Sequence, residues 1–330
     1  MSQDKALFPK ITIGMTSFYA ADTIERAIRG AIAQDYPDKE ILIVDDCSGD
    51  NSTQIIKDAI ADIPYARLII HPVNTGFAGA LNTLIENASG EFLAIFDDDD
   101  VSDPQRLMKQ YRRITEYERD YETDLVLCHV ARMQVYENGL ERYEKTIGTK
   151  AGLAPHGEAV ARRILLGDTG VYGHDIVGSC ANCARMGRTN SFRRFGGFDS
   201  SMRRAEDTDF SIRFALGGGH FAGIEEPLVR QTMTGGAEKS VNAEEVAETI
   251  VLNKHKDYLH KIGWFSFVRD WTNIRYAYYR NQWAKMLWLM TCLFAKSPVK
   301  FARKIIWSIP AASTRTAYKD WHSGKLAAEK

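Results

Sequence analysis

Four consecutive aspartates, Asp97 to Asp100, are the residues of this chain whose type and spacing are best suited to chemistry. They follow the apolar run 92–96, which predicts a buried strand, and the carboxyl end of such a strand is where open α/β sheets bind ligands. Four adjacent carboxylates are not all buried and ionised without a cation or hydrogen-bond donors. Mg²⁺ often takes one or two carboxylates together with phosphate oxygens of a substrate. The run therefore predicts a metal–diphosphate site, and the alternative is a solvated acidic loop.

Two other polar clusters follow predicted strands. Thr16, Ser17 and Phe18 come after an alternating, β-branched segment at 10–15, and Asp45-Asp46 comes after the apolar run 40–44. Because the carboxyl ends of parallel strands meet at one edge of a sheet, we expect these residues to line one crevice with the aspartate run. There Asp46 can accept hydrogen bonds from a base or ribose, while Thr16 and Phe18 offer backbone groups and a stacking face.

Strands and helices alternate along the first part of the chain. The hydrophobic periodicity predicts strands at 10–15, 40–44, 66–70, 92–96 and 124–130, and helices at 22–32, 52–63, 77–88 and 103–118. Asp103-Pro104 is typical of a helix start. Residues 131–178 predict a surface excursion over the site, and Glu206 and Asp207 begin a helix that Gly217 ends. This order predicts an α/β fold with a mostly parallel sheet flanked by helices and joined by right-handed crossovers.

Composition restricts the class of protein. The 330 residues are 45% hydrophobic and 26% charged, which is typical of a folded protein, and the net charge of −1 gives no overall field for nucleic acid. Five cysteines, with a lone C-x-x-C at 180–183, fit a reducing compartment better than a disulfide framework or a zinc site. The first residues contain no apolar run of the signal-peptide kind, so we expect a cytoplasmic protein.

The signatures of three other enzyme classes are absent from this chain or fit it less well. A dinucleotide-binding Rossmann site needs G-x-G-x-x-G after the first strand, where only Gly14 is found, and the P-loop motif is absent. Residues 97–101 fit D-x-D-x-V and so resemble the nucleophile motif of haloacid-dehalogenase-like phosphatases. Those enzymes usually carry it on the first strand, whereas three predicted strands precede it here. A phosphatase therefore remains the alternative activity.

Taken together, residues 11 to about 232 resemble the family 2 glycosyltransferases, which have the GT-A fold. Each segment alone is a weak signal, but the ordered set is specific. The segments resemble the family's opening strand and nucleotide loop, its second strand, its helix beside the nucleotide, its D-x-D metal motif, and its acceptor segment with the catalytic base. In this sequence they are 11–19, 34–37 with 40–50, 74–76 with 80–82, 90–91 with 97–100, and 195–199 with 206–207.

The resemblance implies transfer, with inversion, of a sugar from a nucleotide-sugar, most often a UDP-sugar, with Mn²⁺ or Mg²⁺. It implies that Asp46 recognises the base and that Asp99 with Asp97 holds the metal, although Asp97, Asp99 or Asp100 could each approach the ion. It further implies that Asp207 is the general base and that Glu206 orients Asp207 or binds the acceptor. It also implies a nucleotide site that comprises Thr16, Ser17, Phe18, Asp46, Asn82, Asp97 and Asp98. The implied acceptor is a glycan or lipid-linked saccharide of the bacterial polysaccharide type. A non-catalytic sugar-nucleotide-binding protein is a further alternative, against which the intact acidic set argues.

The resemblance predicts a catalytic domain over 1–235, with a nucleotide half at 1–103 and an acceptor half at 104–235, and a helical extension over 236–330. That extension holds basic residues and all six tryptophans: Trp264, Trp271, Trp283, Trp288, Trp307 and Trp321. Its apolar run 286–295 is far shorter than a spanning helix, and 300–306 predicts an amphipathic helix that Pro310 ends. We expect peripheral contact of 264–321 with the inner face of the plasma membrane. The alternative is packing on the catalytic domain or in a homodimer.

Overall fold

The computed structural model describes residues 8–233, 240–309, 316 and 319. The described residues divide into two compact units, one formed by 8–158 and 178–233 and the other by 159–177 with 240–309, 316 and 319. Residues 159–177, which the sequence analysis assigned to the catalytic domain, therefore group with the helical extension. The two units are described separately.

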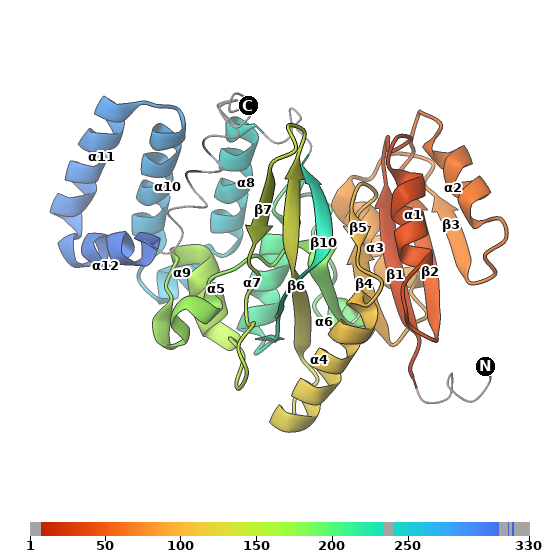
Figure 1. Ribbon diagram of the computed structural model, residues 1–330. Helices are drawn as coiled ribbons and strands as arrows, with labels where there is room; N and C mark the ends of the chain where they lie inside the picture. Colours follow the sequence, from red (N-terminus) through yellow and green to blue (C-terminus); the bar gives the residue numbers. More distant parts are fainter. Residues whose placement is uncertain (1–7, 234–239, 310–315, 317–318, 320–330) are drawn as a thin grey trace. The chain divides into compact units, whose positions relative to one another are not determined.

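The first unit is built on a mixed sheet with the strand order β3-β2-β1-β4-β8-β6-β10-β5, and β7 and β9 both pair with β6 (Figure 1). β1 to β4 are mutually parallel, β8 runs antiparallel to β4 and β6, and β10 is parallel to β6. The strands are β1 (Ile11–Ser17), β2 (Lys39–Asp45), β3 (Ala66–Ile70), β4 (Phe92–Phe96), β5 (Val101–Ser102), β6 (Val126–Tyr136), β7 (Glu141–Glu144), β8 (Arg185–Arg188), β9 (His220–Phe221) and β10 (Ile224–Met233).

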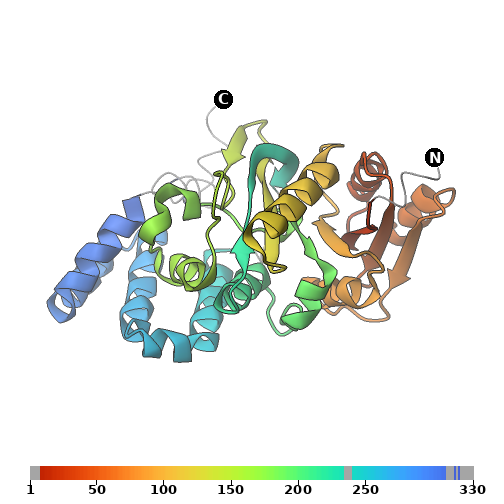
Figure 2. The ribbon, with the colours of Figure 1, turned by 90° about the horizontal axis from the view of Figure 1, so that it is seen from below.

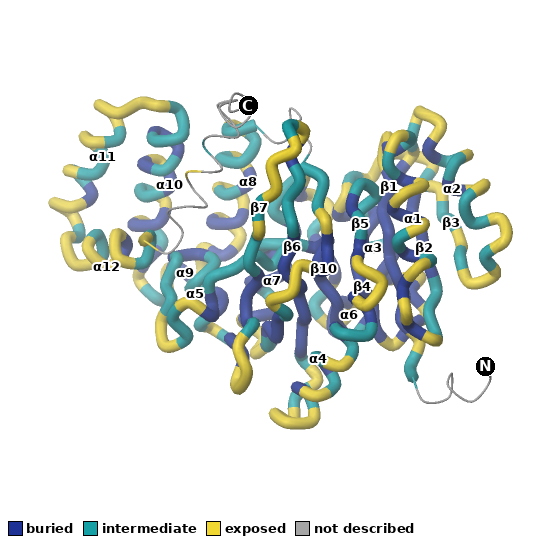
Figure 3. The backbone as a smooth tube through the Cα atoms, viewed as in Figure 1, coloured by how far each residue is buried: buried dark blue, intermediate teal, exposed yellow. Residues whose placement is uncertain are grey.

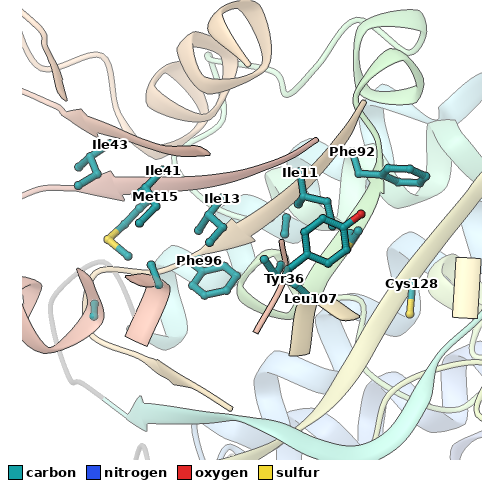
Figure 4. Packing of buried hydrophobic residues seen from close by; sticks show 14 of the residues in the cluster. Ile11, Ile13, Met15, Tyr36, Ile41, Ile43, Phe92, Phe96, Leu107 and Cys128 are labelled. Carbon is teal, nitrogen blue, oxygen red and sulfur yellow. The ribbon is translucent and has the colours of Figure 1, made fainter. Parts of the chain in front are cut away.

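Helices cover both faces of this sheet, as Figure 2 shows for α1 and α3. The helices of the unit are α1 (Ile24–Ile32), α2 (Ser52–Ile60), α3 (Phe77–Asn87), α4 (Arg106–Tyr121), α6 (Thr189–Arg194) and α7 (Glu206–Leu216), and α5 (Gly157–Leu166) leads into the second unit. On one face, Ile11, Ile13 and Met15 of β1 pack with α1 and α4 (Figure 4). On the other face α3 approaches β1 closely, because a Cβ at Gly14 would lie 3.1 Å from the Leu84 side chain. The α/β fold with a mostly parallel sheet is confirmed.

One local prediction was wrong. α4 begins at Arg106, not at Asp103, because residues 104–105 form a turn in which the Gln105 amide donates to Asp103 Oδ1 at 2.9 Å. Residues 131–178 contain regular elements that the sequence analysis did not predict. β6 continues to Tyr136 and forms a hairpin with β7, and α5 and the 3₁₀ segment Gly170–Ile176 follow.

The second unit is helical. It contains α8 (Val241–Lys254), α9 (Lys256–Lys261), α10 (Phe265–Tyr279), α11 (Trp283–Lys296) and α12 (Pro298–Ser308). Aromatic side chains hold part of it together, since the Trp264 ring centroid lies 5.3 Å from that of Trp307, and Trp271 contacts Phe301 edge to face. Within the ranges described, the structure has no helix both long and apolar enough to cross a membrane. Pro310 and Trp321 lie outside the described residues.

Candidate functional site

The carboxyl ends of three adjacent parallel strands bring the predicted clusters together. β1 lies between β2 and β4, with Ser17 in register with Asp45 and Met15 with Phe96. The chain after β1 and the chain after β4 are joined directly, because the Phe18 amide donates to Asp98 Oδ2 at 3.1 Å. The prediction that these residues share one edge of the sheet is therefore confirmed.

The loop after β1 contains buried hydroxyl groups and an exposed aromatic ring. Thr16 and Ser17 are buried, and the Ser17 hydroxyl has no hydrogen-bond partner. Phe18 is about half exposed and packs edge to face against Tyr19, whose amide donates to Ser48 Oγ at 3.0 Å. Tyr19 has a φ of 53°, in the left-handed region that is uncommon for side chains of this size. This loop is suited to stacking against a flat ligand.

Asp46 is buried within a ring of donors from the segment that follows β3. Its Oδ1 accepts from the Thr75 amide and hydroxyl, both at 2.8 Å, and lies 2.7 Å from His71 Nδ1. Its Oδ2 accepts from Asn74 Nδ2 at 2.9 Å and from the Gly76 amide at 2.8 Å. A base that bonds to Asp46 has to replace one of these groups, so recognition of the base by Asp46 stays a prediction.

Asn82 joins α3 to the loop before α7. Its Nδ2 donates to the Phe198 carbonyl at 2.7 Å, and its Oδ1 accepts from the Phe198 amide at 2.8 Å. These two hydrogen bonds position that loop and use one of the two amide hydrogens of Asn82. Contact of Asn82 with nucleotide stays a prediction.

The aspartate run is attached to the end of β10 mainly through its backbone. The Asp99 carbonyl accepts from Arg26 Nη2 at 2.9 Å and from Thr232 Oγ1 at 2.7 Å. Asp100 Oδ1 accepts from the Thr232 amide at 2.9 Å, whereas Asp100 Oδ2 is buried and has no hydrogen-bond partner among the residues that the structure describes. An ionised oxygen buried in this way is costly unless a cation or donor meets it.

Burial and mutual repulsion raise the pKa values of carboxyl groups in the run Asp97 to Asp100. Burial first, and then the neighbouring Asp99, raise the pKa of Asp98 to about 8, although the Phe18 amide opposes the shift. Burial and the charges of Asp97 and Asp99 likewise raise the pKa of Asp100 well above its usual range. Arg106, fully buried with its guanidinium 4.2 Å from the Phe96 ring centroid, is a nearby positive charge. A bound cation would favour the ionised carboxylates.

One set of side chains in the described part of the chain has the spacing of a metal site. Asp97, Asp100 and Cys183 present one ligand atom each, all within 4.8 Å of one another. Burial raises the pKa of Cys183 well above its usual range, so it stays a neutral thiol, which suits a hard cation poorly. The two carboxylates fit Mn²⁺ or Mg²⁺. The predicted pair was Asp99 and Asp97, whereas the structure groups Asp97 with Asp100, because the chain turns after β4.

The Glu206–Asp207 pair stands at the start of α7 as predicted. Glu206 is buried and accepts from Asn182 Nδ2 at 3.2 Å, and Asp207 Oδ1 accepts from the Thr208 amide at 2.6 Å. Burial, then Asp207, raise the pKa of Glu206 to about 8, and the charge of Asp97 adds to the effect. The fold therefore brings this pair into the electrostatic field of the aspartate run, 110 residues earlier in the sequence.

Sequence reasoning missed a buried arginine side chain close to the Glu206–Asp207 pair. Arg185 is fully buried, and its Nη2 donates to the Cys180 carbonyl at 2.7 Å and to the Asp207 carbonyl at 3.3 Å. Its Nη1 has no hydrogen-bond partner. Asn182, which bonds to Glu206, was missed too. Arg185 stands in the four-residue strand β8, and nothing in its sequence surroundings distinguishes it from a surface arginine.

Comparison with known sequences identifies the N-terminal part of the chain. Residues 12–161, less than half of the 330 residues, match the model of Glycosyl transferase family 2. The chain is 41% identical over 105 residues to the succinoglycan biosynthesis protein ExoO of Rhizobium meliloti, a match that covers 32% of this chain and 30% of ExoO. It is 26% identical over 225 residues to EpsE of Bacillus subtilis, which carries a glycosyltransferase name, covering 67% of this chain and 72% of EpsE.

Comparison with solved structures extends the likeness in fold to nearly the whole chain. S. aureus TarS 1–349 in complex with UDP-GlcNAc matches with a TM-score of 0.59 at 17% identity, covering 97% of this chain and 92% of that one. The mannosyltransferase PcManGT from Pyrobaculum calidifontis, in complex with GDP-Man and Mn²⁺, matches with a TM-score of 0.56 at 15% identity, covering 96% and 83%. The fold is that of the GT-A glycosyltransferases, and residues 12–161 are related in sequence to family 2 of these enzymes.

Proposed function

We propose that this protein is an inverting glycosyltransferase that moves a sugar from a nucleotide-sugar to a hydroxyl group of a glycan or lipid-linked saccharide. The proposal rests on one observation. At the end of β4, beside the exposed ring of Phe18, several carboxylates lie close together and have few hydrogen-bond donors. Such a site suits a divalent cation and a nucleoside diphosphate together. The family match of residues 12–161 supports the same activity.

The donor is proposed to be a UDP-sugar, hexosyl or N-acetylhexosaminyl. The similar fold of TarS, solved with UDP-GlcNAc, supports a nucleotide-sugar of this kind. Phe18 stacks on the base, Thr16 and Ser17 offer polar groups to the nucleoside, and Asp98 orients the loop of Phe18 through its amide. Asp97 holds Mn²⁺ or Mg²⁺ with Asp99 or Asp100. The metal, when bound, supplies positive charge to the departing diphosphate.

Asp207 is proposed as the general base. It takes the proton from the acceptor hydroxyl as that oxygen attacks the anomeric carbon from the face opposite the diphosphate. Glu206, with a pKa of about 8, is mainly protonated at pH 7 and cannot serve as the base there. Glu206 instead orients Asp207, and Asn182 Nδ2, which donates to Glu206 Oε1, fixes the position of the Glu206 carboxyl group. Inverting transfer needs one base and no covalent enzyme intermediate.

A donor-hydrolysis assay tests the proposal. The full chain is incubated with UDP-glucose, UDP-galactose, UDP-GlcNAc or GDP-mannose, with Mn²⁺ or with EDTA, and the nucleoside diphosphate released is quantified. We expect slow, metal-dependent release from one donor. Release of p-nitrophenol from p-nitrophenyl phosphate, with no nucleoside diphosphate from any donor, would instead identify a phosphatase. Binding of UDP without turnover, in the presence of candidate acceptors, would favour the non-catalytic alternative.

A further inference from the structure

α11 carries an apolar surface that the described part of its own unit does not cover. Of its 14 residues only Leu293 is buried. Trp283, Leu287, Trp288 and Phe294 are all about half exposed or more, and Trp288 is 68% exposed. At 100° per residue these four side chains fall within an arc of roughly 140°, which is one face of the helix. Figure 3 shows how much of α11 is exposed.

α12 continues the exposed apolar surface. Val299 and Ile306 are 66% and 63% exposed, and Ile309 follows directly after the helix with 66% exposed. The two helices meet where the Phe294 and Phe301 rings pack edge to face with centroids 5.6 Å apart. We call Trp283, Leu287, Trp288, Phe294, Val299, Ile306 and Ile309 the α11–α12 face.

Packing within the unit accounts for only part of α11, where the Trp283 ring packs edge to face on Tyr278 and its centroid lies 4.4 Å from Lys319 Nζ. Its inner side borders a cavity of about 630 Å³, to which α11 contributes Met286 and Met290 and α10 contributes Trp271 and Ile274. The helix therefore has a cavity on one side and exposed tryptophan and leucine on the other. Exposed apolar patches of this kind mark sites of interaction with a membrane or another protein.

The charges around the α11–α12 face favour an anionic partner. Residues 283–309 contain no aspartate or glutamate and five basic residues. Lys285 and Arg303 are exposed, whereas Lys300 and Lys304 turn inward, to the Gly263 and Leu166 carbonyls. Lys296 is exposed too, but its Nζ lies 3.4 Å from Asp270 Oδ2, which offsets its charge. Lys285 stands one turn before Trp288 on the same side of α11. Tryptophan favours the headgroup level of a bilayer, and exposed lysine and arginine favour anionic lipid.

We propose that the α11–α12 face docks on the surface of an anionic phospholipid bilayer, with α11 lying in the plane of the headgroups. Trp283, Leu287 and Trp288 enter the boundary between headgroups and acyl chains, while Lys285 and Arg303 contact lipid phosphates. The use of this contact to reach a lipid-linked acceptor rests on the proposed function. The contact itself does not, so it is measured without any donor.

Flotation of the full chain with vesicles tests the proposal. We expect it to float with vesicles containing phosphatidylglycerol, to stay at the bottom with pure phosphatidylcholine, and to be released by 1 M salt. Trp288→Glu and Leu287→Ser should each lower the bound fraction. Lys285→Gln should weaken binding about 5-fold, as expected for one basic residue near an anionic surface.

The matched control is Val246→Glu, which adds a charge at a 60% exposed apolar position of α8, off the α11–α12 face. It should float like the wild type, and thermal melting should show every variant folded. The proposal is overturned if the wild type stays at the bottom with phosphatidylglycerol, or if Trp288→Glu floats as well as Val246→Glu. It is also overturned if sedimentation shows a dimer that Trp288→Glu dissociates and vesicles capture none of the chain, because the face then binds a second copy.

Discussion

Two acidic clusters stand at the carboxyl ends of β2 and β4, which lie on either side of β1 in the same sheet, and the chain surrounds them in opposite ways. Asp46, after β2, accepts hydrogen bonds from Asn74, Thr75 and Gly76 and contacts His71. Asp100, after β4, accepts a hydrogen bond from the Thr232 amide, and its other oxygen is buried without a hydrogen-bond partner among the described residues.

The difference indicates what each cluster contributes. Where the chain supplies donors for a carboxylate, the carboxylate organises the chain, and here Asp46 holds the 71–76 segment in place. Around Asp98 and Asp100 the chain supplies few donors and several like charges, so the pKa of each carboxyl group rises. A bound cation would complete such a site. The predictions below rest on this contrast, since loss of the first kind of carboxylate should cost stability and loss of the second kind should cost activity or binding.

The largest effect is expected for Asp207→Asn. Loss of the general base should lower turnover by roughly 10²–10⁴-fold, while donor binding and the melting temperature stay near those of the wild type. Steady-state rates of transfer with a natural or synthetic acceptor, together with UDP affinity by calorimetry, measure both. Transfer close to the wild-type rate by a well-folded variant would remove Asp207 from the mechanism.

Asp97→Asn should weaken the metal-dependent part of UDP binding by about 100-fold, because Asp97 would help to hold the ion whose positive charge favours the diphosphate. Asp97 belongs both to the pair predicted from sequence and to the group found in the structure. Calorimetry with UDP, with and without Mn²⁺, measures the loss. Comparing Asp99→Asn with Asp100→Asn then identifies the second ligand, and unchanged Mn²⁺ dependence in all three would refute the site.

Asp46→Ala should instead lower the free energy of unfolding, by about 2–3 kcal/mol, because several buried donors lose their acceptor. Urea denaturation followed by circular dichroism measures this. The matched control is Asp98→Asn, which relieves repulsion and should leave stability unchanged or higher. If Asp98→Asn destabilised the protein as much as Asp46→Ala, the contrast between the two clusters would be wrong. Asp46→Ala should also weaken UDP binding, since the 71–76 segment would shift.

The smallest effect concerns pH and Glu206. Its pKa is about 8 in the folded protein and near 4.5 when unfolded, so the folded state holds a proton that the unfolded state has released between these values. The stabilisation is thus complete below about pH 4.5 and is lost as the pH rises through 8. Melting temperatures without metal should fall more steeply from pH 5 to pH 8 for the wild type than for Glu206→Gln. Parallel curves would contradict the raised pKa.

Sequence reasoning located the elements better than their contacts. The predicted strands 10–15, 40–44 and 92–96 agree with the ends of β1, β2 and β4 to within two residues, because buried parallel strands consist mostly of apolar residues. The helix start at Asp103 was wrong, since a cap depends on the path of the chain and not only on residue type. Nothing in the local sequence shows the hydrogen bond of Asn82 to Phe198, 116 residues away.

The sequence by itself determined the alternation of strands and helices, the acidic run at a strand end and the resemblance to family 2 glycosyltransferases, because hydrophobic period and residue type are local properties. Only the tertiary structure decided which carboxylates have donors. Asp46 is supplied by a segment about 28 residues away, Asp100 by Thr232 and Glu206 by Asn182. The sequence placed the tryptophans in the tail, but the packing of α10, α11 and α12 decided which of them are exposed. Hydrogen bonding and burial depend on neighbours that are distant in sequence, and the fold alone brings these neighbours together.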